Sequence, residues 1–165
     1  MALVTVLPLS TASSVLAAQA PRTETLDSLG VAESNEDQST GLSVEAHTSE
    51  RNESGSLLSV TWSVKNNGNR EVFVDWLTGN SYMYSMTAYF SGVTAISSDG
   101  SNRYHPVMDG ENDCLCSGKL SIDFKENIGP GEQVAYWSMY SVPEDVDAIT
   151  LEIPGFEPIE DIPIS

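Results

Sequence analysis

The sequence predicts an all-β fold, an immunoglobulin-like antiparallel β-sandwich of about seven to nine strands. Apolar and polar residues alternate with a period of two in one short segment after another, which is typical of strands that bury one face. Clusters of Gly, Pro, Asn and Asp separate these segments at intervals of about 8–15 residues, and no segment has a convincing 3.6-residue apolar stripe. Two packed sheets are the natural arrangement for such strands, and a closed barrel is the competing architecture.

The clearest strand is expected at residues 58–65, where apolar and polar residues alternate without a break. The residues that follow, Asn66–Asn69, tolerate left-handed backbone and indicate a hairpin. We expect Trp62 and Trp137 to be central core residues. Further strands are expected at residues 42–46, 72–76, 92–96, 104–108, 120–124, 134–140 and 149–153.

The N-terminal residues predict export from the cytoplasm. Residues 1–20 contain no charged side chain, the run Ala2–Leu9 is apolar, and Ala18–Ala20 fits a small-x-small cleavage site. No Lys or Arg precedes the apolar run. A membrane span is the alternative, but Pro8 and several Ser and Thr residues make the segment a poor one. We therefore predict a signal peptide at residues 1–20, with no stable membrane anchor after cleavage, and a secreted protein, released or loosely wall-associated.

Charge and composition divide the remainder of the chain. Residues 21–39 are acidic and lack apolar periodicity, so we predict a disordered acidic linker, with an acidic interaction tail as the alternative, before a β-sandwich domain at residues 40–165. The whole chain has 24 Asp and Glu against 7 Lys and Arg, a net charge of −17. Such a surface repels nucleic acid and anionic membranes, so the expected partner is another protein or the cell envelope.

The only two cysteines, Cys114 and Cys116, are the most distinctive local feature. In an oxidising compartment a disulfide is expected, but in a strand two Cα atoms at i and i+2 lie near the upper limit for bridging. An intrachain bridge at a local bend, an intermolecular disulfide or reduced buried thiols therefore stay open. So does a metal or redox site completed by His47 or His105.

No catalytic or cofactor site is predicted. Neither histidine lies near a Gly-x-Ser-x-Gly elbow, and no Gly-rich phosphate loop is present. The plentiful carboxylates leave a glycosidase-type pair open by counting, but they fall on turns and solvent-facing positions. The segment Asp109–Asp113 has the oxygen-ligand spacing of a calcium loop, and an acidic turn explains it as well.

An aromatic segment offers a candidate interaction surface at Tyr82, Tyr84, Tyr89 and Phe90. Tyr is enriched where proteins meet partners. The alternative is that alternate members of this segment pack in the sandwich core.

Three parts of the sequence resemble one family of proteins: the strand and hairpin at residues 60–68, the Pro-Gly-Glu turn at Pro130–Glu132, and the segments from Tyr136 to Ile164. Together with the Cys-Leu-Cys-Ser segment they are similar to uncharacterised secreted immunoglobulin-like β-sandwich proteins of actinobacteria. The resemblance implies a fold and a compartment but no activity. We therefore expect a non-catalytic secreted domain that contacts a protein or the cell envelope. The alternative is a small-ligand or metal/redox-responsive binding protein that uses the Cys-x-Cys segment.

Overall fold

The structure is a computed structural model, and it describes residues 26–79, 83–84 and 89–165. The predicted signal peptide and residue Tyr82 lie outside the described residues. In the described part the chain forms ten strands and two 3-10 helices, and no α-helix. They are β1 (Gly30–Glu33), η2 (Asp37–Ser39), β2 (Leu42–Arg51), β3 (Leu58–Asn66), β4 (Val72–Phe73), η3 (Asp75–Thr78), β5 (Thr94–Ser97), β6 (Arg103–Tyr104), β7 (Asn127–Ile128), β8 (Gln133–Tyr140), β9 (Ala148–Glu152) and β10 (Ile159–Pro163). Among these described elements, no helix has the length and apolar character to cross a membrane.

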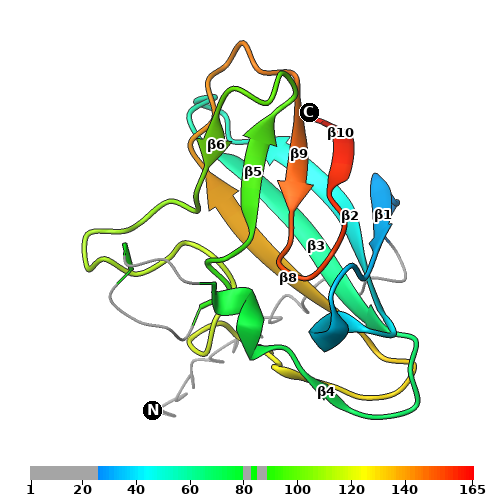
Figure 1. The fold of residues 1–165 in the computed structure, drawn as a ribbon. Coiled ribbons are helices and arrows are strands. Elements are labelled where there is room, and N and C mark those ends of the chain that lie inside the picture. The colour runs from blue at the N-terminus through cyan, green and yellow to red at the C-terminus, as the bar shows by residue number, and fades with distance from the viewer. Residues whose placement is uncertain (1–25, 80–82, 85–88) are drawn as a thin grey trace, which may run out of the picture.

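Two four-stranded antiparallel sheets form the body of the molecule. One sheet has the order β1-β2-β3-β8 and the other β10-β9-β5-β6, while β4 and β7 pair separately. Figure 1 shows them as two layers, with β5 and β9 crossing in front of β3 and β8. The predicted all-β antiparallel sandwich is confirmed. The strand count exceeds the predicted range because β1, β7 and β10 lie outside the segments in which the sequence predicted strands.

The core lies between the two sheets and centres on aromatic side chains. Trp62 on β3 pairs with Tyr136 on β8, and their rings lie 4.9 Å apart between centroids. Phe90 packs at 4.9 Å from both Tyr136 and Phe124. The prediction for Trp62 is confirmed, since its side chain is fully buried. The prediction for Trp137 is wrong: successive strand residues face opposite sides, so Trp137 lies half-buried on the outer face.

The strand predicted at residues 120–124 is wrong. Hydrogen bonds from Ser121 N to Gly118 O and from Phe124 N to Ser121 O close two successive turns. Leu120 and Ile122 therefore point into solvent, with 72% and 91% of their surface exposed. An alternating pattern of three apolar residues does not make a strand when no neighbouring strand pairs with it.

The predicted boundary at residue 40 also differs from the structure. Strand β1 lies inside the expected disordered linker and pairs with β2 in antiparallel register, Gly30 opposite Ala46. Its backbone hydrogen bonds order the segment, although only Ala32 in it is buried. The sandwich therefore begins about ten residues earlier than the composition indicated. After Pro154–Gly155, strand β10 adds a further edge that the sequence pattern did not predict.

A close backbone contact between two glycines holds the turn after η3. Gly92 N donates to Leu77 O at 3.0 Å. A Cβ atom on Gly92 would lie 2.8 Å from Leu77 O and 2.9 Å from the backbone of Gly79. Gly79 itself has a positive φ of 64°, which favours glycine.

We expect Gly92→Ala to lower the free energy of unfolding by about 1–3 kcal/mol, because the added methyl group meets backbone atoms that cannot move aside. Urea denaturation measures the change. Gly110→Ala is the matched control, since a Cβ there meets nothing within 4 Å. Equal stabilities of the two variants would contradict the close contact.

Candidate binding groove beside strand β8

Strand β8 is the edge of the first sheet, and a second segment continues that sheet along half of its length. Ser117 N donates to Trp137 O at 2.8 Å, and Met139 N donates to Leu115 O at 2.9 Å. Isolated bridges join Cys116 with Ser138 and Pro106 with Tyr140. The segment 106–118 therefore covers the edge of β8 from residue 137 to residue 140.

The first half of β8 has no such neighbour among the described residues. In an antiparallel ladder, backbone groups point alternately to one neighbour and to the other. Trp137 and Met139 use theirs toward Val107 and residues 115–117, so Ala135, two residues earlier, directs its N–H and C=O to the same side. No described strand pairs there. Ala135 thus presents an open strand edge.

A groove of about 850 Å³ runs along this open edge. Residues 133–137 of β8 line one side, and the loop that carries Leu120, Ile122 and Phe124 lines the other. Leu120 and Ile122 are the two most exposed large apolar side chains of the described part. An apolar groove beside unpaired backbone groups combines the two features by which sheets bind extended chains.

The groove carries a small excess of negative charge. The charged side chains that line it are Asp123, Lys125 and Glu132, and the segment 109–132 as a whole contains six carboxylates and two lysines. Each lysine already faces a glutamate: Lys125 pairs with Glu132, and Lys119 lies 3.7 Å from Glu126. Hydrogen bonds from Lys125 and from the backbone N–H of Gly129 lower the pKa of Glu132, so this carboxylate stays ionised beside the groove.

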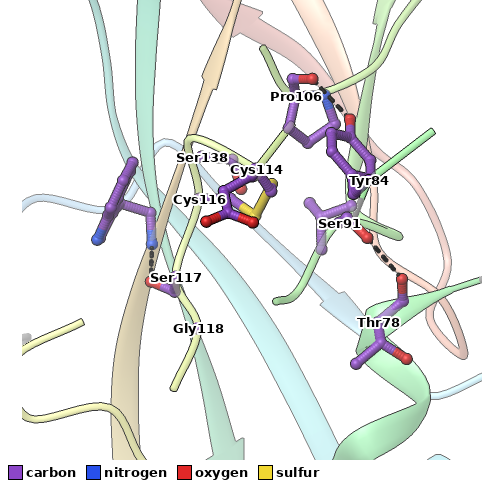
Figure 2. Close-up of a disulfide and its surroundings, with 12 residues drawn as sticks. Thr78, Tyr84, Ser91, Pro106, Cys114, Cys116, Ser117, Gly118 and Ser138 are labelled. Carbon is purple, nitrogen blue, oxygen red and sulfur yellow. Dashed lines mark hydrogen bonds between the residues drawn. A yellow bond between two sulfur atoms is a disulfide. The ribbon is translucent and has the colours of Figure 1, made fainter. Parts of the chain in front are cut away.

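The disulfide is part of the groove lining. Cys114 and Cys116 are joined, and their Cα atoms lie 5.3 Å apart, within the usual range for disulfides. Only one residue separates them, a shorter separation along the chain than disulfides usually have. Both residues are buried, at 4% and 1% exposure, and pack with Tyr84 and Tyr89. Figure 2 shows the bridge between Tyr84 and the Ser138 position on β8. Of the alternatives that the sequence left open for the two cysteines, the structure shows the intrachain disulfide, at a local bend of the chain.

The aromatic residues predicted as an interaction surface are buried in the structure, so that prediction is wrong for the three that are described. Tyr84 donates to Pro106 O at 2.6 Å, Tyr89 packs on the disulfide, and Phe90 lies in the core. The segment 106–118 contacts Tyr84 and Tyr89, whereas Phe90 packs on Trp62 and Tyr136 between the sheets. Tyr82, the fourth, lies outside the described residues.

The histidines do not meet the cysteines. His47 is buried on the outer face of the first sheet, 2.8 Å from Ser63 Oγ through Nε2. His105 is exposed and lines a different cavity. Asp109 accepts hydrogen bonds from the backbone N–H groups of Glu111 and Asp113, as an acidic turn does. In the part of the chain that the structure describes, no three His, Cys, Asp or Glu residues gather as metal ligands.

That second cavity, of about 870 Å³, is lined by residues near η2 and η3, by Arg103 and His105, and by residues 152–156 at the end of β9. Arg103 donates to Thr94 Oγ1 and pairs with Glu152 on its wall. The indole N–H of Trp76 is buried without a hydrogen-bond partner in the described residues. An ordered water is the usual partner of such a donor.

The apolar groove was not predicted from the sequence. Leu120 and Ile122 alternate with polar residues, and that pattern predicts a strand with one buried face. The signal that separates such a strand from an exposed loop is the run of turn-forming residues around them, Ser117-Gly118 and Ser121.

Comparison with known proteins gives a limited result. No protein-family model and no curated protein matches the chain. Among solved structures, an uncharacterised β-sandwich protein from Clostridium difficile is 14% identical, with 73% of this chain and 85% of that chain covered and a TM-score of 0.37. A functionally unknown protein from Listeria monocytogenes is 11% identical, with coverages of 84% and 85% and a TM-score of 0.41. A conserved hypothetical protein from Bacillus anthracis is 12% identical, with coverages of 79% and 96% and a TM-score of 0.40. We draw no functional argument from similarities at this level.

We expect the fold to lose stability in alkaline solution, in part through Tyr84. Burial raises the pKa of Tyr84 to about 12, whereas a tyrosine in the unfolded chain titrates near its usual value of about 10. The folded state therefore keeps a proton that the unfolded state loses, and stability falls as the pH rises from about 10 through 12. Urea midpoints between pH 9 and 12 should fall less steeply for Tyr84→Phe. Identical slopes would contradict a buried phenol.

We also expect the Cys114–Cys116 bridge to be present in the purified protein. Peptide mapping without reduction should recover both cysteines on one peptide and no reactive thiol. Reduction should lower the free energy of unfolding by about 1–2 kcal/mol, because so short a loop restricts the unfolded chain only slightly. The double variant Cys114→Ser, Cys116→Ser serves as the control that reductant leaves unchanged. Alkylation of both thiols in unreduced protein, or a disulfide-linked dimer, would contradict the intrachain bridge.

Proposed function

We propose that this chain is a secreted, non-catalytic module that binds another protein or the cell envelope through the groove beside β8. The observation that carries this proposal is the pair of exposed apolar residues, Leu120 and Ile122, on the wall of a groove. Exposed apolar groups that gather at a concave surface are typical of sites where a partner removes them from water.

Export is supported by features of the chain that agree with one another. The uncharged apolar run in residues 1–20 has the character of a signal peptide. A bridge between Cys114 and Cys116 fits an oxidising compartment. The likeness of residues 60–68 and Pro130–Glu132 to secreted actinobacterial proteins points the same way. We accordingly place the mature protein outside the cell, released or loosely wall-associated.

A binding role is better supported than a catalytic one. Ser63 and His47 resemble a nucleophile and its base by distance, but both are buried. The other ring nitrogen of His47 faces the backbone carbonyl of Asp27, and Ser63 also accepts from Gln133. These contacts support a structural role for the pair, because a substrate would need to reach the serine oxygen. The alternative of a metal- or redox-responsive site has less support, since both cysteine side chains are bonded to each other and buried.

We expect the double variant Leu120→Asp, Ile122→Asp to lose partner binding while it keeps its thermal stability, because both side chains already lie in water. Immobilised protein is incubated with the culture and cell-envelope fractions of its host, and binding of each captured protein is then measured directly after purification. Val31→Asp is the matched control, an exposed apolar residue on β1, outside the groove.

If the double variant binds the partner as strongly as the original protein does, the groove is not the binding site. A purified chain that turns over substrates in broad hydrolase and glycan panels would overturn the non-catalytic role.

A further inference from the structure

We propose that the groove binds an extended, cationic segment of another polypeptide, which adds as a strand to the open edge of β8. This inference rests on the proposed function and names the partner chemistry of the same site. The occupant alternates apolar and basic residues. It occupies the position that the segment 115–117 occupies further along β8.

The backbone of this molecule already provides half of the required interaction. Ser117 is the last residue of the segment 106–118 that bonds to the backbone of β8: its N–H donates to Trp137 O, and its Oγ accepts from Trp137 N. Beyond it, Gly118 N donates to Ser121 Oγ, and the turn carries the chain away from the sheet. The edge therefore becomes free at Ala135, where a new strand would meet an outward N–H and C=O in the register that residues 115–117 set.

The side chains around the edge fit alternate residues of an incoming strand. Successive side chains of a strand point to opposite faces of its sheet. At this edge, Trp137 lies on the outer face of the first sheet, while Phe124 packs on the core-side ring of Tyr136. Apolar side chains of the incoming strand would meet Phe124 on the core-side face, and its basic side chains would lie on the outer face beside Trp137. Leu120 and Ile122 would cover the strand from the loop.

The negative charge of the groove and of the whole chain favours a partner segment of positive charge. Of the three charged side chains that line the groove, Lys125 pairs with Glu132. Asp123 adds a negative charge, within a chain of net charge −17, so the electrostatic field at the groove favours a cationic ligand. A second copy of this chain would bring the same acidic segment against itself, which disfavours self-association at this edge.

The test uses the full chain and synthetic peptides of about ten residues that alternate Val and Lys. Titration is followed by calorimetry and by tryptophan fluorescence. We expect binding that weakens at high salt and at least a tenfold loss of affinity when alternate backbone nitrogens of the peptide are N-methylated, because each methyl group removes a donor that strand addition requires. N-methylation leaves the protein unchanged, so its folding does not enter the comparison. A peptide with Glu in place of Lys should bind at least tenfold more weakly.

The outcomes separate this inference from the proposed function. If methylated and unmethylated peptides bind equally, and Leu120→Asp with Ile122→Asp abolishes both, the groove remains a binding site but strand addition is overturned. If the Glu peptide binds as well as the Lys peptide, the charge argument is overturned. If no peptide binds, while a natural partner depends on Leu120 and Ile122, the partner chemistry is overturned. If sedimentation shows a dimer that the double variant dissociates, the occupant is a second copy and the inference is overturned.

Discussion

The pairing of β3 with β8 is the constraint on which the core and the groove both depend. The two strands run antiparallel from Leu58 opposite Tyr140 to Lys65 opposite Gln133. This register places the rings of Trp62 and Tyr136 side by side in the core. Because side chains alternate across a strand, Tyr136 inside means Trp137 outside. A shift of one residue would exchange the two faces, which would expose Tyr136 and fill the groove wall with a different set of side chains.

Polar contacts on the outer face hold the same strands together near the open edge. Strand β2 has an irregularity in its register between Ala46 and Thr48, and His47 lies at that point. From there its ring reaches Ser63 on β3, while Gln133 at the start of β8 donates to both Ser63 and Glu45. Buried polar side chains that satisfy one another fix strand positions more strictly than apolar contacts do. The end of β8 that borders the groove is therefore held in place before any partner arrives.

The parts of the fold that the sequence predicted are those in which a local pattern is enforced by burial. Residues 58–65 and 134–140 lie in strands with one face in the core, so their alternation is visible in the chain. Strand β1 is a four-residue edge with one buried side chain, and its order comes from backbone bonds to β2, which composition does not reveal. Residues 120–124 show the opposite error, an alternation without a partner strand. The sequence identifies the two cysteines as distinctive, but it does not reveal the groove. Pairing between residues far apart in the chain decides which strand lies at the edge of a sheet, and no local pattern reports it.

The edges of the first sheet differ in how far other segments cover them, and this difference relates the open edge of β8 to the acidity of the chain. The β1 side of the first sheet is closed by residues after β9, since Asn35 N donates to Gly155 O and Glu157 N donates to Glu33 O. On the β8 side, the segment 106–118 protects only half of the strand. An unprotected edge beside apolar side chains invites association between copies of the same protein. In a chain with 17 more acidic than basic side chains, the net charge opposes association between copies. The same charge attracts a basic strand. Under the strand-addition proposal, the acidity that opposes self-pairing at this edge is also the property that would make the edge selective.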